Sequence, residues 1–171
     1  MFISPPTKAS PSLLRQPAGF LALGFGSGLS PWMPGTAGSL AALPLAYWLK
    51  MLPLWLYFVV LAVTVLIGFW ACDVTGKRLG VHDHGAIVWD EFCGLWLTVA
   101  LVPNQWPWLV LGFFLFRAFD IAKVWPASWF DRKVHNGIGV MLDDLAAGLW
   151  GMLVLQAMVW WMVNQRLAAL A

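Results

Sequence analysis

The sequence predicts an all-α membrane protein, a polytopic bundle of about four or five apolar helices with two polar cytoplasmic loops. Of its 171 residues, 61% are hydrophobic and only 11% are charged, whereas soluble domains carry about 25% charged residues. The mean hydropathy of +0.76 excludes an ordinary soluble enzyme, because so few polar side chains cannot cover a water-facing surface. A net charge of +2 without a basic run gives no sign of a nucleic-acid partner.

Two predicted helices are long enough to cross a membrane. The charge-free stretches of the chain are residues 16–49, 51–72, 92–116 and 145–165. About 20 apolar residues cross the hydrocarbon as a helix, so 51–72 and 145–165 are predicted to span it. Residues 1–17 are rich in Pro and Ser and lack the apolar core of a signal peptide. We expect a flexible tail over 1–17 and one membrane domain over 18–171.

The other two stretches are interrupted. The Gly, Pro and Ser residues of 24–39 oppose a continuous helix before about Leu40, so only 39–49 is predicted helical there. Residues 103–105 divide 92–116 into two arms of 11 residues, each about 16 Å long as a helix. Either these arms extend into their flanks, or they form a re-entrant hairpin buried in protein.

The distribution of Lys and Arg predicts the orientation. Cytoplasmic loops are enriched in these residues. If the N-terminal tail is cytoplasmic, eight of the ten lie on that side and only Lys50 and Arg166 lie outside. Both polar loops are then cytoplasmic.

The acidic residues are confined to one part of the chain. All eight lie between Asp73 and Asp144, in two loops that share one membrane face. The five at predicted helix boundaries are Asp90, Glu91, Asp120, Asp143 and Asp144. A charge near hydrocarbon is normally paired, solvated or bound to a cation, and clustered carboxylates favour Mg²⁺ or Mn²⁺. These five are therefore candidate metal ligands and catalytic residues.

A simpler interpretation exists for four of them. Asp and Glu are preferred at helix N-termini as caps and dipole partners, which alone could explain the pairs at 90–91 and 143–144. It does not explain Asp120, which ends a helix. Arg117 and Lys123 lie three residues on either side of Asp120. They either neutralise it or bind a phosphate group.

The glycine-rich segment GFGSGLSPWMPGTAGS, residues 24–39, offers backbone N–H groups. Such a loop can form an anion-binding nest, in which Gly26 and the hydroxyls of Ser27, Thr36 and Ser39 would contact substrate. The alternative is a plain loop with Thr36 or Ser39 as the N-cap of the next helix. His135, in the second polar loop, is either a substrate contact or a solvated residue.

Several motifs together resemble one family. GFGSGLSPWMPGTAGS, IVWDEFCG, FRAFDIAKVWP, WFDRKVHNGIGVMLDD and LAAG occur in the order and spacing of phosphatidylglycerophosphatase A, over about residues 24–148. The resemblance implies a Mg²⁺-dependent, multi-pass enzyme of the bacterial inner membrane. Such enzymes remove the terminal phosphate of the phospholipid phosphatidylglycerophosphate and leave phosphatidylglycerol.

The resemblance also assigns residues. Asp90 and Glu91 match the family's DE motif, Arg117 and Asp120 its FRxxD motif, and Asp143 and Asp144 its LDD motif, while Gly26, Ser27, Gly35, Thr36 and Ser39 fall in its glycine-rich motif. The chain departs from the family at Val124, where Pro is common, and at 136–137, where a pair of glycines is expected. Neither departure affects a carboxylate.

These observations suggest a mechanism and leave a rival from another functional class. The carboxylates would bind one or two Mg²⁺ ions and activate a water that attacks phosphorus in line. Arg117, Lys123 and the glycine-rich segment would stabilise the phosphate charge, at headgroup depth on the cytoplasmic side. The rival is an ion or proton transporter, since intramembrane carboxylates also mark transport paths. Residues 51–72 and 145–165 contain almost no polar side chains of the kind that such a path requires.

Overall fold

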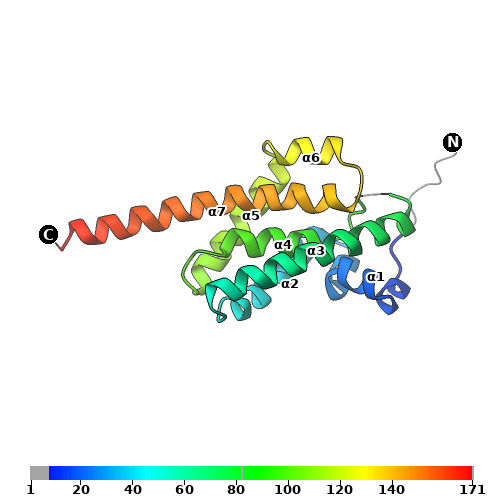
Figure 1. Cartoon of the computed structure of the whole chain (residues 1–171), viewed down its shortest axis with the longest axis horizontal. Coiled ribbons are helices and arrows are strands. Elements are labelled where there is room, and N and C mark those ends of the chain that lie inside the picture. The colour runs from blue at the N-terminus through cyan, green and yellow to red at the C-terminus, as the bar shows by residue number, and fades with distance from the viewer. Residues whose placement is uncertain (1–7, 82, 171) are drawn as a thin grey trace.

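The computed structural model describes residues 8–81 and 83–170, and this part of the chain is helical without a strand. Its elements are η1 (Pro11–Arg15), α1 (Pro17–Ala22), η2 (Gly24–Leu29), α2 (Pro34–Leu49), α3 (Leu54–Leu79), α4 (Trp89–Val99), α5 (Trp106–Ala122), α6 (Ala127–Lys133) and α7 (Gly137–Ala168), where η marks a 3-10 helix. The all-α prediction is confirmed. In Figure 1, α7 is the longest helix, and its C-terminal part extends beyond the other helices.

Helix α4 is the centre of the bundle. It packs against α2, α3, α5 and α7, and ten of its 11 residues are buried. Its most extensive contact is with α7, where a Cβ added to Gly148 would lie 2.4 Å from the carbonyl oxygen of Gly94. The Thr98 hydroxyl lies 2.9 Å from that same oxygen and 3.2 Å from the Gly148 carbonyl oxygen. Small residues thus allow the two backbones to touch.

In the stretch over 92–116 the two arms extend into their flanks, which is one of the two arrangements that the sequence left open. This stretch forms a helical hairpin, α4 and α5, whose arms extend into the flanks to Trp89 and Ala122. At 11 residues, α4 is too short to cross a bilayer and lies inside the protein. Lys50 Nζ donates to the carbonyl oxygens of Val99 at 2.7 Å and Ala100 at 3.0 Å. These bonds satisfy carbonyls at the C-terminal end of α4, which have no partner within the helix.

The glycine-rich segment becomes helical earlier than predicted. Helix α2 begins at Pro34 rather than at residue 39, and its N-cap is Met33 in the left-handed region, with φ 45°. Pro is favourable in the first turn of a helix, where its missing N–H removes no hydrogen bond. The prediction that Thr36 or Ser39 caps this helix is therefore wrong, since both lie inside it.

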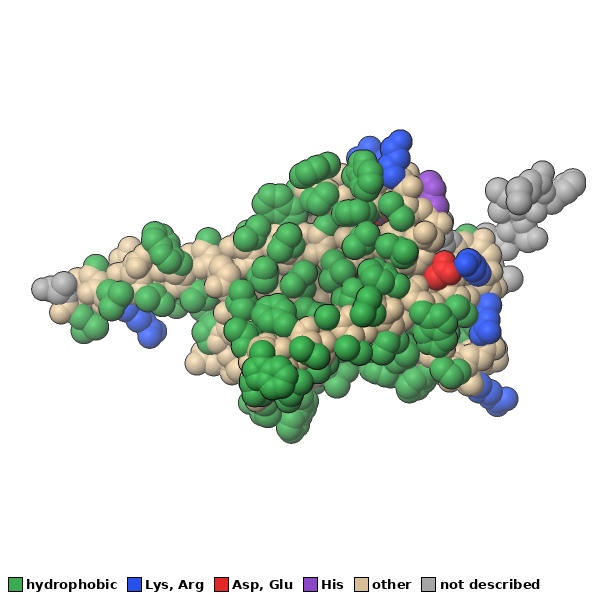
Figure 2. All heavy atoms as spheres, viewed as in Figure 1, with side chains coloured by type: hydrophobic (Ala, Val, Ile, Leu, Met, Phe, Trp, Pro, Cys, Tyr) green, Lys and Arg blue, Asp and Glu red, His purple; other side chains and the backbone are tan. Residues whose placement is uncertain are grey.

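Helices α3 and α7 are the two in the described chain that are long and apolar enough to cross a membrane, as predicted for 51–72 and 145–165. In Figure 2 hydrophobic side chains cover most of the visible face, while most Lys and Arg gather at the end where α3 ends and α7 begins. This arrangement indicates association with a membrane. Of the predicted tail, Pro11–Arg15 form η1, which packs on α1 and η2, and residues 1–7 lie outside the described chain.

The close contact between α4 and α7 predicts that adding one methyl group at Gly148 destabilises the protein. Gly148→Ala should lower the free energy of unfolding by about 1–3 kcal/mol, the usual cost of overpacking, because the new Cβ meets backbone atoms of Gly94 that cannot move aside. Thermal unfolding of the detergent-purified protein measures the loss. Gly85→Ala, where an added Cβ meets no atom within 4 Å, is the control. Equal melting temperatures for the two variants would contradict the predicted contact.

Candidate active site

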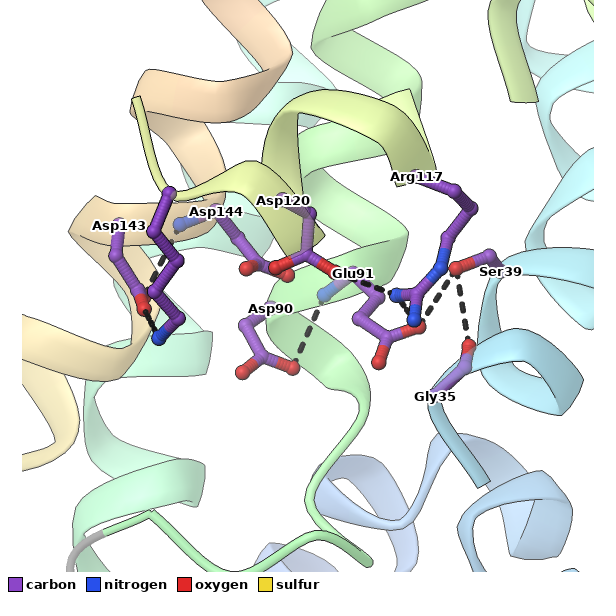
Figure 3. Close-up of polar contacts among 9 residues, drawn as sticks. Gly35, Ser39, Asp90, Glu91, Arg117, Asp120, Asp143 and Asp144 are labelled. Carbon is purple, nitrogen blue, oxygen red and sulfur yellow. Dashed lines mark hydrogen bonds and ion pairs between the residues drawn. The ribbon is translucent and has the colours of Figure 1, made fainter. Parts of the chain in front are cut away.

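Carboxylates from three helices and a loop line one cavity of about 300 Å³. Its acidic lining residues are Asp83, Asp90, Glu91, Asp120, Asp143 and Asp144, and its other lining residues are Pro34, Gly35, Gly85, Ile87, Lys123 and Val140. We refer to this as the acidic cavity. The structure thus brings together all five carboxylates singled out from the sequence. Figure 3 shows those of Asp90, Glu91, Asp120 and Asp144 directed toward a common space.

Each helix supplies its carboxylates from a different position. Asp90 and Glu91 lie in the first turn of α4, where the helix dipole favours negative charge. Asp143 and Asp144 lie well inside α7, whose N-cap is Asn136; its Oδ1 accepts from the N–H groups of Ile138 and Gly139. The capping interpretation is therefore wrong for Asp143 and Asp144.

Arg117 connects two of the carboxylates. Its Nη1 lies 2.7 Å from Asp120 Oδ2 and 3.2 Å from Glu91 Oε2. Ser39, from α2, donates to Glu91 Oε2 at 2.6 Å (Figure 3). Burial raises the pKa of Glu91 to about 7, although Arg117 and Ser39 act in the opposite direction. A Cβ at Gly35 would lie 2.2 Å from Glu91 Oε1, so glycine leaves the space that this carboxylate occupies.

Lys123 turns away from Asp120. It ends α5 in the left-handed region, with φ 43°, and its Nζ lies 2.5 Å from Asp131 Oδ1 and 2.9 Å from Asp143 Oδ2. Burial alone would lower the pKa of Lys123, but its hydrogen bonds with Asp131 and Asp143 raise it above its usual range. Of the two nearby cations, Arg117 is thus the one that neutralises Asp120.

The acidic cavity has more carboxylates than cations. Six carboxylates line it, and the cations paired with them are Arg117 and Lys123. Burial, followed by the nearby Glu91, Asp143 and Asp83, raises the pKa of Asp90 well above its usual range. Asp144 Oδ2 is buried without a hydrogen-bond partner in the described chain. Such a group is unfavourable unless a cation or a proton reaches it.

The cavity is not a ready-made metal centre. Within residues 8–81 and 83–170, no group of three or more His, Cys, Asp or Glu side chains is arranged to hold a metal ion as it stands. Four of the six carboxylates that line the cavity, those of Asp90, Glu91, Asp120 and Asp143, are instead held by Arg117, Lys123, Ser39 and backbone N–H groups.

The other predicted substrate contacts lie apart from the acidic cavity. Gly26 and Ser27 belong to η2, where the Ser27 hydroxyl donates to the Gly24 carbonyl oxygen at 2.8 Å. Thr36 is half-buried in the first turn of α2 and does not line the cavity. His135 lines a separate cavity of about 820 Å³ between α3 and the start of α7.

Two acidic residues near the cavity were not singled out from the sequence. Asp83 lines the cavity from the loop before α4, and Asp131 reaches Lys123 from α6. Both occur in polar loops beside the motifs DE and LDD. This proximity in sequence is the one signal that could have suggested them.

Comparison with known proteins identifies the family. A family model described as phosphatidylglycerophosphatase A matches residues 20–159. The chain belongs to this family. It is 52% identical over 137 residues to phosphatidylglycerophosphatase A of Escherichia coli, with 80% of each chain covered. It is 43% identical over 152 residues to that of Haemophilus influenzae, covering 88% of this chain and 93% of the relative. No solved structure matches the chain.

Family membership selects between the two functions considered from the sequence. A phosphatidylglycerophosphatase is a phosphoric monoester hydrolase, so the chain is an enzyme and the transporter interpretation is not supported. The motifs that carried the resemblance, over residues 24–148, lie inside the matched range of 20–159.

The space beside Glu91 predicts the outcome of a single substitution. Gly35→Ala should displace the Glu91 carboxylate from Ser39 and Arg117, because the new Cβ would lie 2.2 Å from Oε1. We expect the displaced carboxylate to raise the free energy of the transition state by about 1.4 kcal/mol. This corresponds to a roughly tenfold lower kcat/KM. Phosphate release by the purified variant measures this.

A shorter acid at position 91 tests the cause of that loss. The effect of Gly35→Ala should shrink in a Glu91→Asp background, where the clashing carboxylate is withdrawn by one carbon. An undiminished effect in that background would show that Gly35 acts by some other route.

Proposed function

We propose that the acidic cavity is the active site, where the enzyme hydrolyses the terminal phosphate of phosphatidylglycerophosphate to give phosphatidylglycerol, with Mg²⁺ as cofactor. The convergence of six carboxylates on one cavity carries this proposal. The uncompensated negative charge and the unpartnered Asp144 Oδ2 fit a divalent cation, and a donor set made only of carboxylate oxygens fits Mg²⁺ or Mn²⁺.

The proposed metal ligands come from the family's three acidic motifs. They are Asp90, Glu91, Asp120, Asp143 and Asp144. A bound Mg²⁺ ion supplies charge neutralisation for phosphate oxygens and a lowered pKa for water. Two of these residues are now hydrogen-bonded to the N–H of the following residue, Asp90 to Glu91 and Asp143 to Asp144. Those bonds fix one oxygen of each carboxylate, and the second oxygen of Asp143 accepts from Lys123 Nζ at 2.9 Å.

The remaining groups act on the substrate. Arg117 and Lys123 bind the oxygens of the phosphate group and stabilise its charge as a water attacks phosphorus opposite the leaving glycerol oxygen. A carboxylate not engaged with the cation accepts the proton of that water. Ser39 positions Glu91 through its 2.6 Å hydrogen bond. Gly26, Ser27, Thr36 and His135, which lie outside the cavity, are proposed contacts for the lipid headgroup.

The substrate is a membrane lipid, and we place the site accordingly. Residues 18–171 form one multi-pass domain of the bacterial inner membrane, with the acidic cavity at headgroup depth on the cytoplasmic side. The two membrane-length helices and the position of eight of ten Lys and Arg residues support this. The substrate then reaches the cavity laterally from the bilayer.

Removing one negative charge from the cavity should abolish turnover. Asp120→Asn and Asp144→Asn each keep the side-chain shape but remove a proposed ligand, and losses of about 10²-fold or more are expected, the range seen when a group that stabilises the transition state is removed. Phosphate release from phosphatidylglycerophosphate is measured with Mg²⁺ and with chelator, and with phosphatidic acid as a competing substrate. Asp73→Asn, at a carboxylate paired with Lys77 outside the acidic cavity, is the matched control.

The outcomes separate the parts of this proposal. Wild-type rates for Asp144→Asn would contradict the assignment of the site. Full activity in chelator would contradict the role of Mg²⁺ alone. Preference for phosphatidic acid would contradict the proposed substrate.

A further inference from the structure

Lys123 is held between carboxylates of two different helices. Asp131, on α6, lies 2.5 Å from its Nζ, and Asp143, on α7, lies 2.9 Å from it. Lys123 also has a backbone conformation, φ 43°, that residues other than glycine adopt at a cost. The two ion pairs therefore hold a cation at a place that the backbone alone would not favour.

The two carboxylates differ in what surrounds them. Asp143 lines the acidic cavity and its side chain is 9% exposed, whereas Asp131 does not line that cavity and its side chain is 33% exposed. Asp143 is a proposed metal ligand, so a cation in the cavity would compete with Lys123 for its oxygens. Asp131 would then remain as the partner of Lys123.

We propose that Asp131 is a positioning residue, which keeps the Lys123 ammonium at the wall of the acidic cavity, where it meets the phosphate group of the substrate. This rests on the function proposed above. In this proposal Asp131 contacts Lys123, and Lys123 in turn contacts the phosphate group and Asp143. Asp131 itself contacts neither the substrate nor a metal ligand.

The surroundings of α6 allow Asp131 to be tested without unfolding this region. The segment before α6 is anchored independently, since Trp150 Nε1 donates to the Trp125 carbonyl oxygen at 2.9 Å and Ala127 is 1% exposed. The neighbouring Arg132 is directed elsewhere, with its Nε donating to the Ser128 carbonyl oxygen at 2.9 Å. Partly exposed ion pairs contribute little to stability, so loss of the Asp131 charge should leave the fold intact.

Kinetics of four proteins test the proposal: the wild type, Asp131→Asn, Lys123→Met and the double variant. Asp131→Asn should lower kcat/KM about tenfold, mainly through KM, since a displaced cation no longer meets the bound phosphate. Lys123→Met should lose at least as much. In the Lys123→Met background, Asp131→Asn should have no further effect, because residues that act through one contact are not additive.

Three further measurements complete the test. Asp131→Glu should restore more than half of the lost kcat/KM, and Arg132→Gln, on the same helix, should match the wild type within twofold. Melting temperatures should be unchanged. Unaltered kinetics in Asp131→Asn, or an equal loss with and without Lys123, would overturn the inference while leaving the proposed function standing. Absence of phosphate release by the wild type would contradict the proposed function, and this inference with it.

Discussion

The excess of negative charge inside an apolar bundle is the constraint on which the rest of the structure depends. Six carboxylates share a cavity of about 300 Å³, and such charges must be hydrogen-bonded, paired or bound to a cation. Helix α4 makes this possible. It is too short to span a bilayer, yet its buried position carries Asp90 and Glu91 into the centre of the protein. Its distant end is stabilised there by Lys50 and by Tyr57, whose hydroxyl donates to the Trp96 carbonyl oxygen.

The two cations at the cavity are used in different ways. Arg117 carries a planar guanidinium, which suits contact with two carboxylates at once; it pairs with Asp120 on its own helix, α5, and connects that helix to α4 through Glu91. Lys123 has a compact charge on a flexible stem, and it connects the end of α5 to α6 and α7. Together they hold carboxylates of α4, α5 and α7 around the acidic cavity. The ion pairs thus position these side chains and also neutralise part of their negative charge.

The sequence predicted those parts of the site that depend on charge and length. Residues 51–72 and 145–165 were identified as helices by their freedom from charge, and the five carboxylates were grouped because acids are unfavourable beside hydrocarbon. Contacts between loops were not predictable in this way. Asp131, on α6, lies eight residues from Lys123 and meets it across a turn in which Lys123 has a left-handed conformation. The Gly, Pro and Ser content of residues 24–39 predicts a later start for α2 than the structure shows, because Pro34 lies in the first turn of that helix, where proline is favourable.

The glycine-rich segment influences the acidic cavity mainly through its packing against the residues that precede α4. Gly35 is its one glycine that lines the acidic cavity. A Cβ at Gly28 would lie 2.1 Å from the Ala86 carbonyl oxygen, and one at Gly38 would lie 2.6 Å from Val88 Cβ. The N–H of Val88 also donates to the Ala22 carbonyl oxygen at 2.8 Å. These contacts hold the residues that lead directly into α4. The segment thus fixes the direction in which Asp90 and Glu91 enter the cavity, and its glycines permit this close approach.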